Sequence, residues 1–421
     1  MTASRSPAET TLASQFEGSA PSPERAAAFE RFAAAGLPTR RVESWHYTDL
    51  RAAMHDAAPL APAPGEAAIA AARAALSGRA KAAGARLVTL NGRFVAELSD
   101  APPAGATLAR RGSAAGAGDA MAALVEAMAP DALVLEVAAG AHLAEPVEIV
   151  HLAVGEGAAA LYGWTEINLG AGARATVIES FEGAGAAAQR HAATTLRLAR
   201  GAQLKHVAAI GDDPELHLES QIVELQADSA LNAFGLVAGG ALSRRQIFAR
   251  LDGEEARIGL GGLALIEGKR RADTTLQVTH AAPRGTSREF YRSIVADEAA
   301  GIFQGKVVVA PGAQKTDGAM KAQAVLLSPE AQMTAKPELE IFADDVVCGH
   351  GATVASIDPE QIFYLQSRGI RKDDAEAMLL EAFGCEAIGR VEDEALEEAL
   401  RARLVAWLAG RRQTATTEAR S

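Results

Sequence analysis

The chain has 421 residues, more than one compact core usually holds, so we expect two or three structural units. Its formal net charge of −12 argues against broad binding to nucleic acid or acidic lipid, because both rely on Lys and Arg that neutralise phosphate. No stretch approaches the roughly 18 apolar residues that cross a membrane, and residues 1–12 lack the apolar run of a secretory signal. Two cysteines make no disulfide framework. We expect a cytoplasmic protein with neither nucleic acid nor membrane as a partner.

Residues 1–130 carry mainly helical signals. Ser22 followed by Pro23 is typical of a helix start, since a serine hydroxyl caps free backbone N–H groups and proline lacks the N–H that would be unpaired there. Asn91-Gly92 between two apolar runs predicts a tight hairpin. We therefore expect an N-terminal, mostly helical region, with further helices over residues 66–76 and 119–128.

Residues 131–358 change to a period of two. Short alternating runs such as Leu133, Leu135 and Val137 are separated by small turns, and no helical stretch is long enough for a βαβ unit. Four similar segments recur at a spacing of about 26 to 30 residues, beginning at Ile167, Leu196, Val223 and Ala249. Such repeats must stack to bury their apolar faces, which favours a parallel β-helix. A β-sandwich remains the alternative on this pattern alone.

Residues 359–421 return to helical signals. Asp358 is a candidate N-cap, and Gly369 is placed to end the first helix. A second helix is expected to start at Asp373 or Asp374 and to end at Gly384, and a third carries leucines at steps of four. These amphipathic helices could cover the end of the solenoid or dock a partner.

Enzymatic signatures are missing from the sequence. There is no phosphate-binding loop, no glycine-rich dinucleotide turn, no HExxH, no paired CxxC and no nucleophile elbow. Arg288, Arg292 and Lys306 could bind an anion, but solvated surface is the default expectation. The chain is therefore expected to be non-catalytic.

One constellation could bind a metal. Cys348 and His350 are two residues apart in a run that favours a strand, so both side chains would project from one face. Thiolate and imidazole are ligands that iron and zinc prefer, but a closed site needs four ligands. A metal held here would need ligands from another chain. The alternative is that Cys348 is a small buried hydrophobe and His350 a hydrogen-bonded edge residue.

Three long segments resemble one known family. They are GLPTRRVESWHYTDLR (residues 36–51), SREFYRSIVADEAAGIFQGKVVVAPGAQKTDG (287–318) and PELEIFADDVVCGHGATVASID followed by EQIFYLQSRGI (337–370). Together they resemble the SufB/SufD family of iron–sulfur cluster assembly scaffolds, and the first segment is similar to the SufD branch. Gly349 departs from the family pattern, because many relatives have Ser there, and His46 stands where Lys is common.

The resemblance implies a right-handed parallel β-helix flanked by N-terminal and C-terminal helical regions. It also implies pairing with SufB through the β-helix, docking of the ATPase SufC on the C-terminal domain, and a transient Fe–S cluster or iron at the SufB–SufD interface. His350 and Cys348 then match the shared cluster site. The SufC-docking region would contain Phe363, Tyr364, Leu365, Ser367, Arg368 and Gly369.

Nucleotide hydrolysis would belong to SufC. Reduced FAD has been associated with the complex, although these residues contain no flavin fingerprint, and the isolated chain could form a homodimer. Three alternatives remain: a SufB-type paralogue, a purely structural β-solenoid, and an enzyme built on a β-helix, such as a polysaccharide lyase or an acyltransferase.

Overall fold

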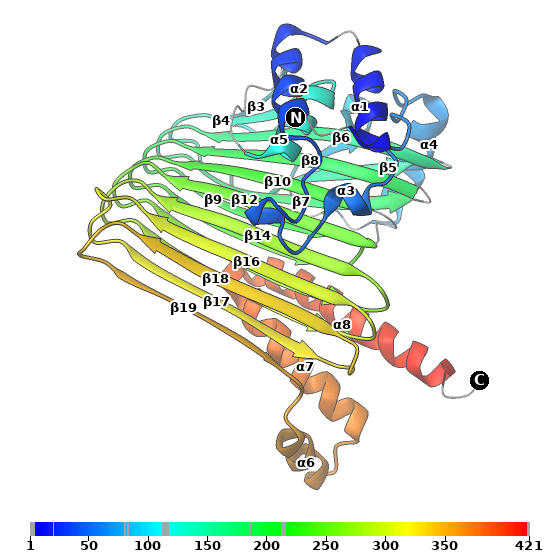
Figure 1. The fold of residues 1–421 in the computed structure, drawn as a ribbon, viewed down its shortest axis with the longest axis vertical. Helices are drawn as coiled ribbons and strands as arrows, with labels where there is room; N and C mark the ends of the chain where they lie inside the picture. The colour runs from blue at the N-terminus through cyan, green and yellow to red at the C-terminus, as the bar shows by residue number, and fades with distance from the viewer. Residues whose placement is uncertain are drawn as a thin grey trace.

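A computed structural model describes residues 5–19, 21–79, 81, 84–111, 118–155, 157–184, 187–211 and 216–418. Within these ranges the chain forms two long sheets that face each other, with helices on their outer faces (Figure 1). The expected mainly-β solenoid is confirmed. None of the helices described combines the length and the apolar character that a membrane span requires.

The two sheets are built from alternate strands of the chain. The ten-stranded sheet contains, in sequence order, β1 (Arg86–Leu90), β2 (Arg93–Phe94), β5 (Val147–Val154), β7 (Arg174–Ala184), β9 (Gln203–Ile210), β11 (Ala230–Val237), β13 (Arg257–Ile266), β15 (Thr286–Val295), β17 (Asp317–Leu326) and β19 (Val347–Ala355). The nine-stranded sheet contains β3 (Ala106–Arg111), β4 (Ala132–Val137), β6 (Ala158–Leu169), β8 (Ala187–Leu198), β10 (Leu216–Leu225), β12 (Leu242–Leu251), β14 (Arg271–His280), β16 (Ala300–Val309) and β18 (Gln332–Ile341).

Each strand from β4 to β17 pairs in parallel with the strand two positions later in the chain. The shortest step is 26 residues, from Leu216 to its partner Leu242, and the longest is 32, from Ala300 to Gln332. The repeat expected from the sequence is therefore one coil of the solenoid. Antiparallel pairing is confined, among the described strands, to β1 with β2 and β3 with β4, so the Asn91-Gly92 hairpin is confirmed.

One turn of each coil uses a residue with positive φ at the same place. Backbone N–H groups of these residues donate to a carbonyl of the next coil, for example from Gly172 to Arg200 and from Arg284 to Gln314, each at 2.9 Å. The series comprises Gly140, Gly172, Gly201, Asp228, Glu255, Arg284 and Lys315, with φ from 58° to 71°. Glycine adopts this conformation without strain. The repeated turn thus closes each coil in the same way.

Alternation of side chains along the strands creates the interior. Leu204, Leu231 and Ile258 are register partners on successive coils, and all three belong to one buried cluster between the sheets. These branched side chains fit the pleated surface of strands buried on both faces.

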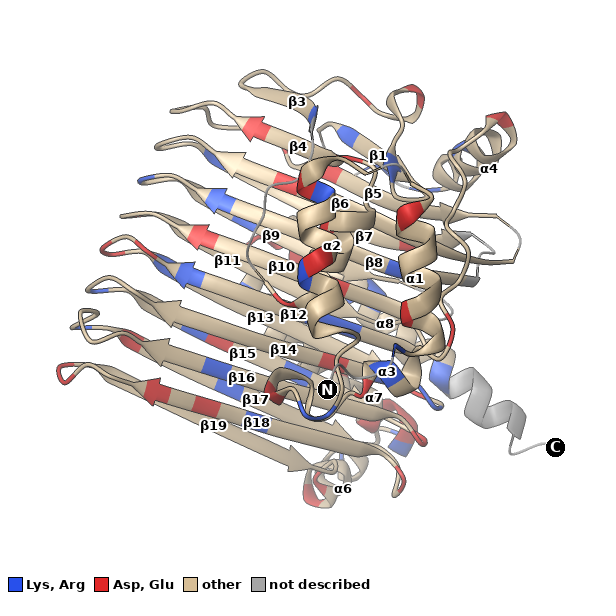
Figure 2. Ribbon diagram, turned by 45° about the horizontal axis from the view of Figure 1, so that its top comes forward, with Lys and Arg blue, Asp and Glu red and all other residues tan. Residues whose placement is uncertain are grey.

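The N-terminal helices cover the nine-stranded sheet (Figure 2). α1 (Pro7–Glu17), α2 (Pro23–Ala35), the short α3 (Leu50–Ala53) and α5 (Ala120–Met128) contribute to a second buried cluster with outward residues of β6, β8 and β10. Trp45 anchors the connecting segment, because its ring lies 3.8 Å from the guanidinium carbon of Arg244 and its Nε1 donates to Asp119 at 2.8 Å. α4 (Glu66–Ser77) packs near β5 and β1.

The C-terminal helices cover the outer face of the ten-stranded sheet and leave the solenoid end, with β18 and β19, uncovered (Figure 1). α7 (Lys372–Ile388) and α8 (Glu394–Glu418) bury Leu263 and Leu265 of β13, while α6 (Pro359–Ser367) stands away from the strands. The expectation that Gly384 ends a helix is wrong. Gly384 lies inside α7, where a Cβ would come within 2.5 Å of Leu404 Cδ2, so glycine permits close packing of α7 on α8.

Arg292 also differs from the expectation of solvated surface. It is 6% exposed beneath α7, donates to the Phe383 carbonyl oxygen at 2.6 Å, and pairs with Glu386. Its guanidinium carbon lies 4.2 Å from the Phe383 ring centre. This arginine therefore fastens the C-terminal helices to the sheet.

Candidate functional site

Cys348 and His350 lie on β19, the last strand of the ten-stranded sheet. β19 pairs with β17 on one side and occupies the edge of the sheet on the other. His350 is exposed and Cys348 is half-buried. Both residues are thus at the free end of the solenoid.

Register places both side chains on the inward face of this last coil. Cys348 is paired with Gly318 and packs against the interior cluster, while His350 is paired with Met320, a core residue that is 2% exposed. Since no further coil follows β19, inward-facing groups here reach solvent. The sequence-based expectation that the thiol and imidazole share one face is consistent with this pairing.

The thiol is free, and burial raises the pKa of Cys348 above its ordinary value. Metal binding requires the thiolate, so a metal must displace this proton. In the part of the chain that the structure describes, no three His, Cys, Asp or Glu side chains are close enough together to hold a metal ion. Cys348 and His350 can therefore supply at most a partial ligand set.

A buried carboxyl group lies two strands inward from this pair. Glu289 on β15 is the register partner of Met320 on β17, which in turn is the partner of His350 on β19. Glu289 is 2% exposed. Burial raises the pKa of Glu289 to about 8. We did not predict this residue, although the inward positions Ser287, Glu289 and Tyr291 alternate in the sequence and could have indicated it.

The interior also contains a polar cluster that the sequence did not predict. Oε1 and Oε2 of Glu179 lie 2.9 and 2.7 Å from Nε2 of His151 and His206, and all three side chains are buried. Burial raises the pKa of Glu179, but the two imidazoles outweigh it and hold the pKa below its ordinary value. The His206 ring is 0% exposed, so it lies inside the coil without access to solvent.

Exposed apolar side chains surround the end of the solenoid and continue onto α6. Phe342 is 62% and Val347 73% exposed next to β18 and β19, and on α6 Phe363 is 72% and Tyr364 57% exposed. Of the other α6 candidates, Leu365 is half-buried and Ser367, Arg368 and Gly369 are exposed. The Arg368 guanidinium carbon lies 5.2 Å from the Tyr364 ring centre. Phe363, Tyr364, Leu365 and Ser367 lie on α6, and Arg368 and Gly369 directly follow it, separate from the strand that carries Cys348 and His350.

Comparisons with known proteins agree on one family. Residues 151–383 match the family described as SUF system FeS cluster assembly, SufBD core domain. The iron–sulfur cluster assembly protein SufD of Escherichia coli is 33% identical over 408 residues, covering 93% of this chain and 94% of that protein. A SufBD family protein of Synechocystis is 29% identical over 205 residues, or 48% of this chain and 45% of that protein. SufD of Bacillus subtilis is 31% identical over 133 residues, covering 32% and 30%.

Proposed function

The chain belongs to the SufB/SufD family of iron–sulfur cluster assembly proteins, and on that premise we propose that β19 supplies half of a cluster site completed by a SufB-type partner. The observation that carries the proposal is the placement of Cys348 and His350 together on an edge strand that has a neighbouring strand on one side only. Thiolate and imidazole suit iron, and two ligands leave room for two more. The cluster is cargo that passes through this site.

The edge itself favours a second chain. β19 presents nine residues, from Val347 to Ala355, with one row of backbone N–H and C=O groups unpaired by another strand. Natural proteins protect long exposed edges, because such edges pair readily with other chains. The exposed side chains of Val347 and Phe342 beside it add apolar area for an interface. A partner strand against β19 would satisfy the backbone and bring new ligands next to His350.

SufB is the partner that family membership favours, and the same edge would let the isolated chain form a homodimer. A homodimer would present two copies of Cys348 and His350, so both assemblies are consistent with a shared site.

We place the docking of SufC on α6. Phe363 and Tyr364 are large, mostly exposed and carried by a helix that stands away from the strands (Figure 1). Aromatic residues of this kind supply much of the binding energy at interfaces. ATP hydrolysis is then the work of SufC, and this chain acts as a non-catalytic scaffold. Reduced FAD in the complex stays a prediction, because nothing in the described residues tests it.

The decisive experiment replaces His350 with Ala in the complex purified with SufB and SufC. We expect normal complex formation by size-exclusion chromatography and a loss of cluster assembly, measured by iron and sulfide content and by visible absorption. Thr353→Ala, on the same strand but on its other face, is the matched control. Unchanged cluster content in a confirmed His350→Ala complex would reject the ligand role.

Two further comparisons separate the remaining alternatives. Cys348→Ser is compared with Cys385→Ser, since both thiols are half-buried with pKa values raised by burial, but Cys385 lies on α7. Phe363→Ser with Tyr364→Ser tests SufC docking better than removal of residues 359–421, because that deletion would also expose the outer face of β13. If the chain is a purely structural solenoid, none of these variants should change cluster content or SufC binding.

A further inference from the structure

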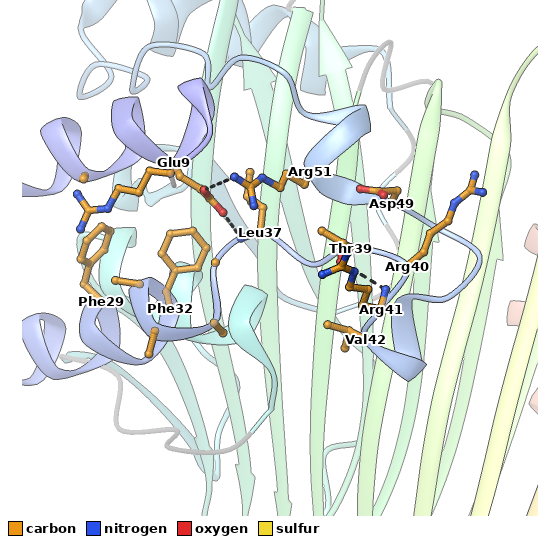
Figure 3. Close-up of a pocket in the computed structure, with 16 residues that line it drawn as sticks. Glu9, Phe29, Phe32, Leu37, Thr39, Arg40, Arg41, Val42, Asp49 and Arg51 are labelled. Atoms are coloured by element: carbon orange, nitrogen blue, oxygen red, sulfur yellow. Dashed lines mark hydrogen bonds and ion pairs between the residues drawn. The ribbon is translucent and has the colours of Figure 1, made fainter. Parts of the chain in front are cut away.

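A cavity of about 720 Å³ lies in the N-terminal region, on the outer side of the nine-stranded sheet (Figure 3). It is partly open to solvent and is lined by four stretches of the N-terminal region, namely α1, α2, the segment after α2 and the start of α3. Its volume is within the range of roughly 300 to 1,000 Å³ typical of small-molecule sites. Neither Cys348 nor His350 contributes to it.

Glu9 fixes the shape of this cavity. Its carboxylate accepts hydrogen bonds from the N–H groups of Ser6 at 2.6 Å and Leu37 at 2.7 Å, and lies 3.6 Å from Arg51 (Figure 3). Gly36 has φ of 70°, and a Cβ there would lie 2.7 Å from Glu9 Oε1. Glu9 therefore joins α1, the segment after α2 and α3 into a preformed wall.

The charges that line the cavity are mainly positive. Four arginines contribute, namely Arg5, Arg40, Arg41 and Arg51, against the carboxylates of Glu9 and Asp49. Both carboxylates are engaged, Glu9 as above and Asp49 by the N–H of Ala52 at 3.0 Å. In the described part of the chain, the guanidinium groups of Arg5, Arg40 and Arg41 have no carboxylate within ion-pair distance. A chain of net charge −12 thus concentrates unpaired positive charge at one cavity.

The other side of the cavity is apolar. Figure 3 shows Phe29 and Phe32 together on one side, with Thr39, Arg40, Arg41 and Asp49 on the other. Phe29 stacks on Phe16 with ring centres 4.1 Å apart, and Phe32 is 2% exposed. Because Phe32 is buried, the half-buried ring of Phe29, held in place by its stacking on Phe16, presents the rigid apolar surface to an aromatic ligand.

We propose that this cavity binds a small aromatic phosphate ester, with its ring against Phe29 and its phosphate on Arg40 and Arg41. Guanidinium groups match phosphate oxygens in planar, two-pronged hydrogen bonds. A phosphate monoester carries close to two negative charges at neutral pH, so it compensates more of the arginine charge than a carboxylate does. Nucleotides and other aryl phosphates share this chemistry.

The test is isothermal titration calorimetry on the full chain with two aromatic phosphates, adenosine monophosphate and 1-naphthyl phosphate. Each is compared with its phosphate-free form, adenosine or 1-naphthol, and with inorganic phosphate. We expect the tighter-binding aromatic phosphate to bind at least roughly tenfold tighter than its phosphate-free form and than inorganic phosphate. The reason is that a charge-assisted hydrogen bond contributes about 1.5–3 kcal/mol. The relative affinity of the two probes distinguishes a nucleotide from a general aryl phosphate.

Arg40→Gln combined with Arg41→Gln should weaken binding by roughly tenfold or more, whereas Arg73→Gln on the exposed face of α4 should leave it unchanged. Phe29→Leu, which keeps an apolar contact with Phe16, should weaken the aromatic phosphates but not inorganic phosphate. Absence of binding by both aromatic phosphates at about 1 mM overturns the proposal. Equal affinity in the arginine double variant and the Arg73→Gln control also overturns it.

Discussion

The Cys348 thiol lies across the gap left by Gly318, its partner on β17. A Cβ added at Gly318 would lie 3.4 Å from Cys348 Sγ and 3.5 Å from Ser287 Oγ, both ordinary contact distances. The thiol at the free edge therefore packs over the backbone of Gly318, and the Ser287 hydroxyl on β15 borders the same gap. The size of the residue at position 318 sets how far the thiol projects.

Gly318→Leu should push the Cys348 side chain outward and increase its alkylation rate by iodoacetamide several-fold. Gly318→Ala should leave the rate unchanged, because its methyl group fits the existing gap. The measurement uses a Cys385→Ser background so that one thiol reports. A rate that rises equally in both variants would contradict this account.

Glu289→Gln should stabilise the protein at alkaline pH. The folded pKa of Glu289 is about 8, above the ordinary value of 4.5, so the folded state keeps a proton that the unfolded state loses. This lowers stability as pH rises from 4.5 towards 8, by about 3 kcal/mol at pH 7. Urea unfolding at pH 4.5 and pH 8 should show a steeper decline for the natural chain than for the variant. Parallel profiles would reject the effect.

His191 should weaken the fold at acid pH. Its ring is 0% exposed and stacks on Tyr162 with centres 4.8 Å apart, and burial lowers its pKa to about 3. The unfolded state gains a proton below about pH 6.5 while the folded state does not, so about 2 kcal/mol of stability is lost by pH 5. His191→Phe keeps the ring contact and should flatten the decline between pH 6.5 and 5. An unchanged slope would show that other groups cause it.

Arg292→Met should loosen α7 from the sheet. It removes the hydrogen bond to the Phe383 carbonyl oxygen and the contacts with the rings of Phe383 and Phe290, which together contribute about 1–3 kcal/mol. Glu386→Gln removes only the ion pair, whose carboxylate is 53% exposed, and should cost less than about 1 kcal/mol. Hydrogen exchange across 372–388 should accelerate in the first variant. Equal acceleration in both would assign the anchoring to the ion pair.

Much of the fold could be predicted because its signals are local. Alternation in the strands, the recurring segments from Ile167 and the turn at Asn91-Gly92 each depend on residues close in sequence. Gly384 was misjudged for a physical reason, since its role is set by Leu404 on another helix. The surface that α7 and α8 cover could not be predicted either, because the apolar face of an amphipathic helix does not indicate which surface it packs against.

Only part of the candidate site could be predicted from the sequence. Cys348 and His350 are two residues apart, and their spacing on a strand predicts a common face. Glu289 lies 59 residues before Cys348 and comes near only through stacking of β15, β17 and β19. The N-terminal cavity escaped prediction because Glu9, Phe29, Arg41 and Arg51 come from separate segments.

The turns with positive φ make the β19 end of the solenoid less stable at high ionic strength. Glycine occupies the turns of the early coils, but Asp228, Glu255, Arg284 and Lys315 occupy the later ones, where a Cβ costs about 1 kcal/mol. Their charges pair along the turn edge, as Lys315 does with Asp345 at 2.6 Å. Exposed pairs of this kind contribute about 0–1 kcal/mol and are screened by ions. Rising ionic strength therefore weakens the ion pairs but does not relieve the backbone strain of these turns. Local unfolding should begin in the coils next to β19. A protein docked on β19 would hold these coils in place.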